Sequence, residues 1–301
     1  MADKKCAPNV EYKDGSCLSI SLLKHIAENE NKKNPNDKIK ISDNKKELVD
    51  NLEKKLKSKC SDQLCWLSLV KNSNDDKIKE EINNTIRPLG PKGKHEWLST
   101  TDINDVVSQY EKQFKDFIFL GAVPADFEQL ISSQTNNINF DDFEKDKKYQ
   151  IGMVINLDDH TQGGSHWVAL YINLKKNQIY YFDSFAKKPS KRTKLFINKI
   201  FNFLYNKKYG KKIDINKLLS DLKSDRNSVK LPSFSVRYNT IQHQFKNSEC
   251  GVYSLNFIIR LVRGESFDTI TKNPTSDDVI NSCRGVYFNN NNSTPIKKNI
   301  C

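Results

Sequence analysis

The sequence predicts an α+β fold, in which a central β-sheet is flanked by helices and preceded by a mainly helical N-terminal domain. Three short runs rich in Val, Ile, Tyr and Phe predict the strands of a buried sheet, and they are Tyr149–Leu157, Trp167–Leu174 and Gln178–Phe182. Apolar residues at helical spacing, within Lys45–Ser58 and again after Cys250, predict helices on both sides of these strands in the sequence.

The first 90 residues predict a helical domain that carries no recognisable catalytic motif. The helical face is formed by Leu48, Val49, Leu52 and Leu56, and the candidate N-caps are Ser42, Asp43 and Asn44. The segment Pro88–Lys94 then contains two prolines and two glycines within seven residues, which is typical of a linker. We therefore predict an N-terminal domain at 1–90, a main domain at 91–290 and a flexible tail at 291–301.

The overall composition is that of a globular protein. A chain of 301 residues with 37% hydrophobic content is long enough to bury a substantial core. The first residues lack the apolar stretch of a secretory signal, and no window approaches the ~20 apolar residues that span a bilayer. We therefore expect the protein inside a cell and unanchored.

The formal charge of +12 comes with lysines spread along the whole chain and with abundant asparagine. This distribution favours a solvated basic surface over a patch that binds phosphates. Nucleic acid therefore stays a weakly supported candidate partner.

Seven cysteines are present, and their odd number and irregular spacing do not suggest a disulfide framework. We expect reduced thiols. Cys60 and Cys65 are near neighbours, but no second close pair completes a structural zinc site. Neither a metal nor a cofactor is predicted.

Two of the predicted strands form a β-hairpin candidate, because the polar segment Lys175–Gln178 separates them. His166 opens the first strand and Asp183 closes the second, so antiparallel pairing brings both residues to the same end of the hairpin. An idealised register leaves an offset of two residues per strand, which is within the accuracy of turn placement. An imidazole beside a carboxylate is the pair that an oriented general base requires.

A nucleophile is predicted at Cys250, which begins an apolar-periodic helix. The positive partial charge and unpaired N–H groups of a helix N-terminus favour thiolate over thiol, as does a nearby imidazolium. Gly251 leaves room for a substrate backbone. Gln244, six positions before the cysteine, could donate its amide to an oxyanion, and Gln242 is its local competitor for this role.

Each of these residues also has a purely structural explanation. A buried cysteine is usually a small hydrophobe, a histidine is usually just hydrogen-bonded, and an aspartate after a strand often makes a turn. His243, between the two glutamines, is better explained as a surface or packing residue than as a second base. Their joint occurrence at the ends of a hairpin and a helix favours the catalytic interpretation.

These residues resemble a known family. Ser165–Leu170, Tyr180–Ser184, and Gln244 followed by Glu249–Tyr253 are similar to the ubiquitin-like-protein-specific cysteine proteases that deconjugate SUMO and to the adenovirus-type proteases. The order His, Asp, Gln, Cys is the same, and the match covers about residues 95–290. The resemblance implies a central mixed β-sheet with helices on its faces, as in papain-like cysteine proteases.

The sequence departs from the cellular deconjugases in two places. Asp158–Gly164 is longer than the corresponding segment before the family's histidine. The N-terminal segment, with Cys17 and the Cys60–Trp66 cluster, instead resembles the extension on thiol proteases of large cytoplasmic DNA viruses. This branch implies cleavage of viral structural precursor proteins during virion maturation, in the host cytoplasm and in the virion.

The resemblance also implies substrate-binding residues. Trp97 and Trp167 would enclose the glycines of a substrate in a narrow tunnel, which implies cleavage after Gly-Gly or a similarly small pair. Asn156 lies in the strand that precedes the histidine and is expected to contact substrate.

Three other activities are compatible with the sequence. One is deconjugation of SUMO or another ubiquitin-like protein. Another is acyl transfer by an acetyltransferase of the same fold family, which would need an acyl-CoA site that nothing in this sequence resembles. A catalytically inactive binding module is disfavoured, because a scaffold has no need for all four residues of the constellation.

Overall fold

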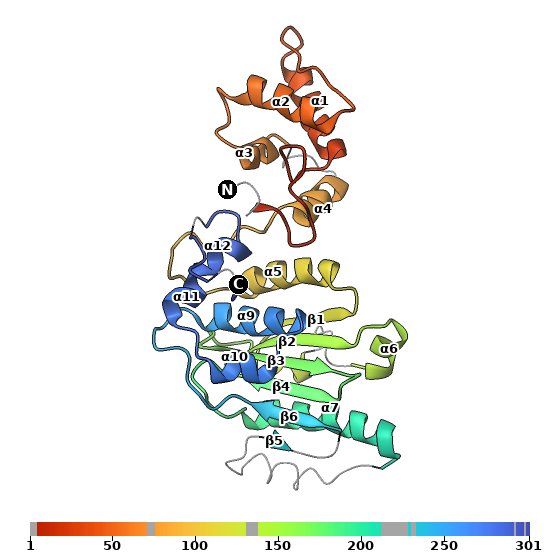
Figure 1. The fold of residues 1–301 in the computed structure, drawn as a ribbon, viewed down its shortest axis with the longest axis vertical. Coiled ribbons are helices and arrows are strands. Elements are labelled where there is room, and N and C mark those ends of the chain that lie inside the picture. The colour runs from red at the N-terminus through yellow and green to blue at the C-terminus, as the bar shows by residue number, and fades with distance from the viewer. Residues whose placement is uncertain are drawn as a thin grey trace. The chain divides into compact units, whose positions relative to one another are not determined.

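The computed structural model describes residues 5–70, 76–130, 138–211, 228–229, 233–291, 293–297 and 299–301 (Figure 1). The chain divides into two compact units. One comprises Met1–Leu89 with Tyr287–Asn289, and the other comprises Gly90–Val286 with Asn290–Cys301. The second unit contains the sheet and every residue of the predicted site, so we call it the catalytic unit.

The N-terminal unit is helical over its described residues. Its helices are α1 (Ile20–Lys33), α2 (Lys45–Leu56), α3 (Gln63–Ser68) and α4 (Asp76–Thr85). Asn44 caps α2 by accepting a hydrogen bond from the Glu47 amide, so it is the cap among the three candidates. The predicted apolar face of α2 is buried in a core that also includes Trp66.

The catalytic unit is built on a six-stranded sheet with strand order β1-β2-β3-β4-β6-β5. The strands are β1 (Phe117–Val123), β2 (Gln150–Asn156), β3 (Trp167–Asn173), β4 (Gln178–Phe182), β5 (Ser228–Val229) and β6 (Ser235–Tyr238). The β1–β2 and β4–β6 pairs are parallel, and the other three pairs are antiparallel. The mixed sheet and its flanking helices confirm the predicted fold class, and the three predicted strands are confirmed to within one residue at each end.

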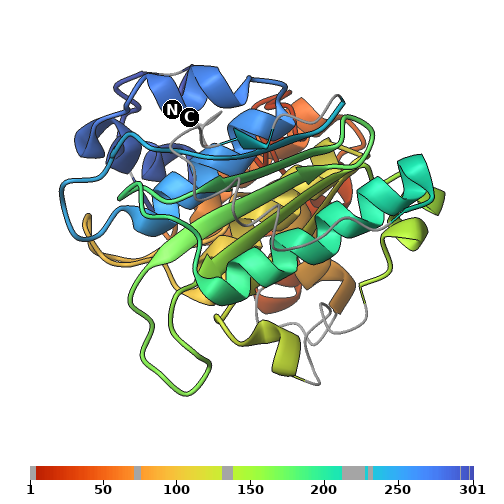
Figure 2. The ribbon, with the colours of Figure 1, turned by 90° about the horizontal axis from the view of Figure 1, so that it is seen from below.

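Helices cover both faces of this sheet (Figure 2). The described helices of the unit are α5 (Thr100–Gln113), α6 (Phe140–Lys145), α7 (Lys191–Tyr209), α9 (Cys250–Val262), α10 (Phe267–Lys272), α11 (Asp277–Ser282) and α12 (Arg284–Tyr287), with a short 3-10 turn at Phe127–Gln129. Alternate residues of β2 point to opposite faces of the sheet, and each face packs against a different helix. Ile151, Met153 and Ile155 share an apolar core with α7, whereas Gly152 points toward α9.

The hairpin of β3 and β4 has its turn one residue earlier than predicted. Asn173 pairs with Gln178, so Gln178 belongs to the strand, and Ala169 pairs with Phe182. Asn177, in the turn, takes the left-handed conformation with a φ of 50°. This register brings the ends of the two strands nearer to each other than the predicted one does.

The cysteines differ from the expectation of reduced thiols. Three disulfides join Cys6 to Cys17, Cys60 to Cys65, and Cys283 to Cys301, and Cys250 is the one free cysteine. All seven cysteines lie within the described residues. The odd number misled the prediction, because six cysteines pair locally, over separations of 11, 5 and 18 residues, and the seventh is kept apart from them.

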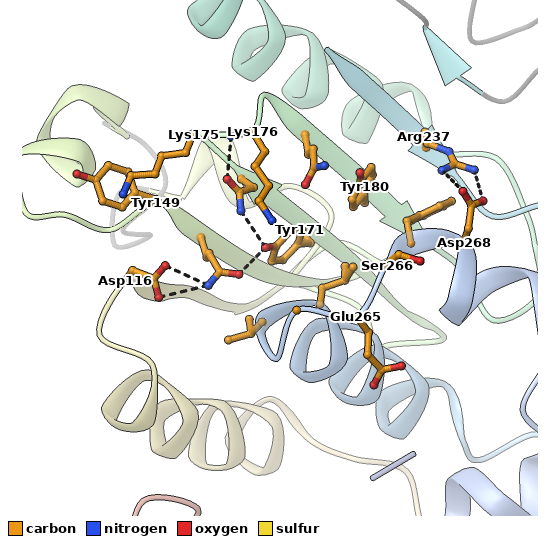
Figure 3. Close-up of a pocket in the computed structure, with 17 residues that line it drawn as sticks. Asp116, Tyr149, Tyr171, Lys175, Lys176, Tyr180, Arg237, Glu265, Ser266 and Asp268 are labelled. Atoms are coloured by element: carbon orange, nitrogen blue, oxygen red, sulfur yellow. Dashed lines mark hydrogen bonds and ion pairs between the residues drawn. The ribbon is translucent and has the colours of Figure 1, made fainter. Parts of the chain in front are cut away.

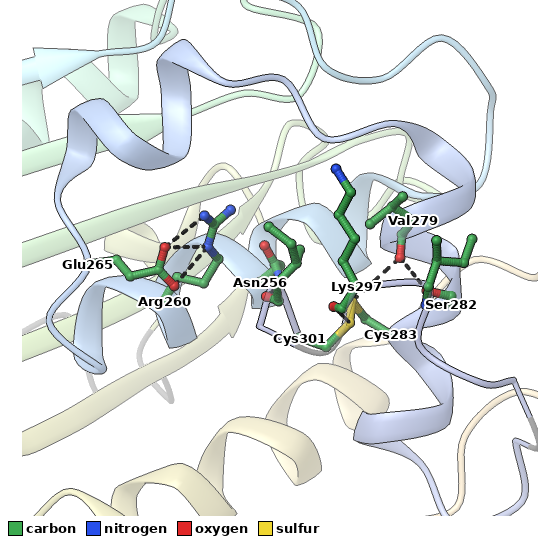
Figure 4. The surroundings of a disulfide bond; sticks show 10 residues. Asn256, Arg260, Glu265, Val279, Ser282, Cys283, Lys297 and Cys301 are labelled. Atoms are coloured by element: carbon green, nitrogen blue, oxygen red, sulfur yellow. Dashed lines mark hydrogen bonds and ion pairs between the residues drawn. A yellow bond between two sulfur atoms is a disulfide. The ribbon is translucent and has the colours of Figure 1, made fainter.

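The tail was expected to be flexible at 291–301, but its described residues are anchored in the catalytic unit. Cys301 is bonded to Cys283 and is buried (Figure 4). Asn256, on α9, donates its amide to the Ile300 carbonyl at 2.7 Å. A covalent bond and a hydrogen bond therefore hold the end of the chain against the helix that begins at Cys250.

Two features are absent from the described residues. No helix there combines the length and apolar character needed to cross a bilayer. Within the same residues, no three His, Cys, Asp or Glu side chains are grouped so that they could hold a metal ion.

Gly152 allows α9 to lie close to the sheet. A Cβ placed there would be 2.9 Å from the Ile258 side chain of α9 and 3.0 Å from Phe117. We expect Gly152→Ala to lower the free energy of unfolding by about 1–3 kcal/mol, because the packed side chains must shift. Urea denaturation followed by fluorescence would measure the change.

Gly163→Ala is the matched control, because a Cβ there meets no atom within 4 Å. It should change stability by less than about 0.5 kcal/mol. Equal effects of the two substitutions would contradict the close approach of α9 to β2.

Candidate active site

His166 and Asp183 meet at one end of the β3–β4 hairpin. His166 immediately precedes β3, and Asp183 immediately follows β4. The imidazole Nε2 donates to the Asp183 Oδ1 at 2.7 Å, and both residues are buried. Because Nε2 is committed to the carboxylate, Nδ1 is the nitrogen available for chemistry.

The Asp183 backbone is fixed by a side chain from another part of the chain. Its amide donates to the Asn239 Oδ1 at 2.9 Å, and the Asn239 Nδ2 donates back to the Asp183 carbonyl at 2.7 Å. Asn239 follows β6, which pairs with β4. The aspartate therefore has little freedom to turn away from the imidazole.

Cys250 is the first residue of α9, and its buried thiol interacts with His166, which helps to raise the pKa of the imidazole. The structure thus joins all three predicted residues, with the imidazole between carboxylate and thiol. The free N–H groups at the start of a helix favour negative charge on the sulfur.

The pKa of His166 is raised to about 9. Burial alone would lower this pKa, but the hydrogen bonds to Asp183 and Cys250 and their negative charges outweigh burial. The imidazole therefore stays protonated at neutral pH, and a cysteine and histidine in this arrangement can form a thiolate–imidazolium pair.

Phe185 covers one face of the imidazole. The two rings stack with their centroids 4.8 Å apart and their planes 28° apart. The Phe185 amide donates to the same Asp183 oxygen that binds His166, at 2.8 Å. The next residue, Ala186, has a φ of 58°, which is costly for a residue other than glycine and closes the turn that directs Phe185 back over the ring.

The two candidate oxyanion donors have different surroundings. Gln244 is buried, its Oε1 accepts from the Ser184 hydroxyl at 2.6 Å, and its Nε2 donates to the Lys246 carbonyl at 2.7 Å. Gln242 is exposed and donates its Nε2 to the Gln244 carbonyl at 2.7 Å. Gln244 is thus hydrogen-bonded to Ser184, the residue next to Asp183, and its amide keeps a second N–H.

The two predicted substrate-binding tryptophans come from two segments that a hydrogen bond joins. Trp167 is buried and donates its Nε1 to the Leu98 carbonyl at 2.8 Å. Trp97, next to Leu98, is 50% exposed. A Cβ placed at Gly251 would lie 3.0 Å from the Leu98 side chain, so this segment packs against the residue that follows the free cysteine.

Asn156 organises the loop between β2 and His166. Its Oδ1 accepts from the Asp158 amide at 3.0 Å and from the Ser165 amide at 3.2 Å. Gly164 takes a φ of 83°, and a Cβ there would be 2.9 Å from the Asn156 amide nitrogen. These contacts close the inserted segment and hold the chain as it enters β3.

Comparison with known proteins decides the family. The profile of the Ulp1 protease family, C-terminal catalytic domain, matches residues 100–291. The chain belongs to the Ulp1 protease family. It is therefore a cysteine protease, which confirms the resemblance that its motifs suggest.

Among relatives of this Ulp1-family protease are two viral proteins. A thiol-protease homologue of Acanthamoeba polyphaga mimivirus is 34% identical over 307 residues, which cover 95% of this chain and 93% of the relative. A cysteine protease of African swine fever virus is 22% identical over 274 residues, or 84% of each chain. The crystal structure of the protease from that virus shares the fold, with a TM-score of 0.68, 19% identity, and coverage of 96% and 97% of the two chains.

Sequence reasoning did not assign several residues that this Ulp1-family site depends on. Ser184 and Phe185 follow Asp183 in the sequence, and this position next to a predicted site residue was the signal that could have identified them. Asn239 and Arg284 have no such signal, because each acts across a long sequence separation. Arg284 is 1% exposed and donates to the carbonyls of Glu96, at 2.6 Å, and Ser248, at 3.2 Å.

A cavity of about 410 Å³ lies away from this cluster, beside the opposite end of α9 (Figure 3). Its lining includes Leu261 near the end of that helix, which is roughly 17 Å along the axis from Cys250 at 1.5 Å per residue. Several of its charged groups are already engaged. Arg237 donates to both carboxylate oxygens of Asp268, at 3.0 and 2.6 Å, and the Lys175 ammonium lies 3.6 Å from the Tyr149 ring centroid.

The raised pKa of His166 predicts the alkaline limit of activity. A group whose pKa is raised stays protonated to higher pH, so we expect kcat/KM to fall at a pH of about 9 as the imidazolium is lost. Asp183→Asn removes a charge that raises this pKa, so the alkaline limb should move to lower pH and the rate should fall. The measurement is a pH–rate profile on a fluorogenic peptide.

Asp126→Asn is the matched control, because Asp126 also binds a histidine, His160, at 2.5 Å but outside the catalytic cluster. Its alkaline limb should coincide with that of the wild type. An unshifted limb in Asp183→Asn would show that the carboxylate does not set the protonation of His166.

Proposed function

We propose that this protein is an endopeptidase in which Cys250 is the nucleophile, His166 the general acid and base, and Asp183 the group that orients the imidazole. The observation that carries this proposal is that the His166 imidazole is hydrogen-bonded to the buried Asp183 carboxylate and also interacts with Cys250, the one free thiol of the described residues. Gln244 is proposed to donate its second N–H to the oxyanion.

The proposed reaction proceeds in two halves. The Cys250 sulfur forms a bond to the scissile carbonyl carbon, and His166 gives its Nδ1 proton to the leaving amine as the C–N bond breaks. Water then attacks the thioester while Nδ1 accepts its proton, and the carboxylic acid leaves as the thiol is regenerated. One oxyanion donor is worth about 3–4 kcal/mol of transition-state stabilisation in comparable sites.

We propose that the substrate has glycine or similarly small residues before the cut. The supporting observation is the segment Trp97–Leu98, which is held through Trp167 and packs against Gly251, beside the nucleophile. A large side chain between two indoles would collide with them, and steric exclusion rejects larger groups more strongly than a pocket rewards smaller ones. Asn156 would contribute by shaping the loop that enters this region.

The proposed biological role is processing of viral structural precursor proteins during virion maturation, at the assembly site in the host cytoplasm and in the virion. Its support is that the relatives compared above are proteases of large DNA viruses. Deconjugation of a ubiquitin-like protein is the second candidate, because the African swine fever virus relative is also named a SUMO-1 cysteine protease.

A peptide library tests the proposed endopeptidase. We expect cleavage after Gly-Gly-like pairs, with most of kcat/KM lost when Ala, Val or Leu precedes the cut, because a β-carbon would meet an indole. Cys250→Ser and His166→Ala should abolish turnover while far-UV circular dichroism stays unchanged. Broad tolerance before the cut would reject the tunnel, and cleavage of a ubiquitin-like conjugate but not of peptides would favour deconjugation.

We further propose that residues 1–90 select or dock the protein substrate. The unit has its own core and two disulfides of its own, and it contains none of the proposed catalytic residues. Deleting residues 1–89 should spare kcat/KM for a short peptide and lower it for a protein substrate. Equal loss on both substrates would mean that the unit is structurally integral to the enzyme.

A further inference from the structure

The turn after β4 connects the two halves of the proposed catalytic machinery. Asp183, its first residue, binds His166. Ser184, its second residue, makes three hydrogen bonds to His243 and Gln244. Its carbonyl accepts from the amides of His243, at 2.9 Å, and Gln244, at 3.0 Å, and its hydroxyl donates to the Gln244 side chain at 2.6 Å.

The hydroxyl contact matters because a carboxamide has two chemically different ends of nearly the same shape. An oxyanion is stabilised only by the N–H end, and rotation of the amide by 180° would present an oxygen and repel the developing charge. Gln244 therefore needs contacts that distinguish its Oε1 from its Nε2. Since the side chain is buried, the protein itself must provide them.

Two contacts hold the carboxamide: the Lys246 carbonyl determines which end is which, and the Ser184 hydroxyl, which can donate or accept, holds the other end in place. The Lys246 carbonyl can only accept, so at 2.7 Å it requires the Nε2 end of Gln244. The Ser184 hydroxyl donates to Oε1 from the other side, and both Ser184 and Gln244 are 1% exposed. In the reversed orientation Oε1 would face the Lys246 carbonyl, with two acceptors in contact.

We infer that Ser184 is a positioning residue, which holds the Gln244 carboxamide with Nε2 directed to the oxyanion. This inference rests on the proposed function, because it assigns a role only if Gln244 acts in acyl transfer. It adds that one turn sets both the histidine and the oxyanion donor.

Ser184→Ala tests the inference, with a Gly-Gly aminocoumarin amide as the peptide substrate. Loss of one buried hydrogen bond should lower kcat about tenfold and leave KM within about twofold, because the oxyanion forms only in the transition state. Alkylation of Cys250 by iodoacetamide displaces iodide at a saturated carbon and forms no oxyanion. Its rate should therefore stay within about twofold of the wild type.

A double-mutant cycle separates positioning from general damage. Gln244→Ala should lower kcat about 10²-fold. In that background Ser184→Ala should cost no more than about a further twofold, because there is no carboxamide left to orient. Ser282→Ala is the control for deletion of a buried hydroxyl, since its Oγ donates to the Val279 carbonyl in α11 and accepts from the Ile296 amide, and it should leave both rates unchanged.

Three results would overturn the inference: a loss below twofold in Ser184→Ala, an equal loss of alkylation rate, or a full Ser184→Ala effect that persists without the Gln244 amide. A wild-type chain that shows no Cys250-dependent cleavage of the peptide would instead overturn the proposed function, and this inference with it. The alkylation rate distinguishes the two cases, because it reports the thiol independently of acyl transfer.

Discussion

The antiparallel pairing of β3 with β4 is the constraint on which the site depends. It brings together His166 and Asp183, which lie 17 residues apart, and fixes their distance through backbone hydrogen bonds instead of through flexible side chains. A slip of one residue would reverse the face of every side chain in a strand. The same register sets where the following turn begins, and hence the positions of Ser184 and Phe185.

The site brings together three elements that come from distant parts of the sequence. The hairpin supplies His166 and Asp183, α9 supplies the free thiol, and the segment Trp97–Leu98 lies against the start of that helix. Buried polar groups hold these elements in place. Asn239 fixes Asp183, and Arg284 joins the carbonyls of two of the converging segments. Burial makes such bonds costly to break, which favours a preorganised site.

Local patterns were sufficient to predict the three central strands, the helix at Cys250 and the hairpin that unites His166 with Asp183, because each depends on periodicity within one segment. The sequence could not reveal Asn239 or Arg284, since a polar residue in a loop looks the same whether or not it reaches a buried partner. The disulfides were missed for a related reason, because pairing depends on the positions that the fold gives to the sulfurs. The tail was judged by its polar composition, whereas it is anchored by the Cys301 disulfide and by the hydrogen bond from Asn256 to the Ile300 carbonyl.

The disulfides place this protease between two opposing redox requirements. The proposed nucleophile, Cys250, can react only when reduced, whereas the three disulfides exist only when oxidised. A strongly reducing solution protects Cys250 but opens the Cys283–Cys301 disulfide, next to Arg284, whose side chain donates to the carbonyls of Glu96 and Ser248. A strongly oxidising solution keeps the Cys283–Cys301 disulfide but converts the Cys250 thiolate to a sulfenic acid. Opposite redox conditions therefore preserve the Cys283–Cys301 disulfide and the Cys250 thiol, a conflict that does not arise in a cysteine protease without crosslinks.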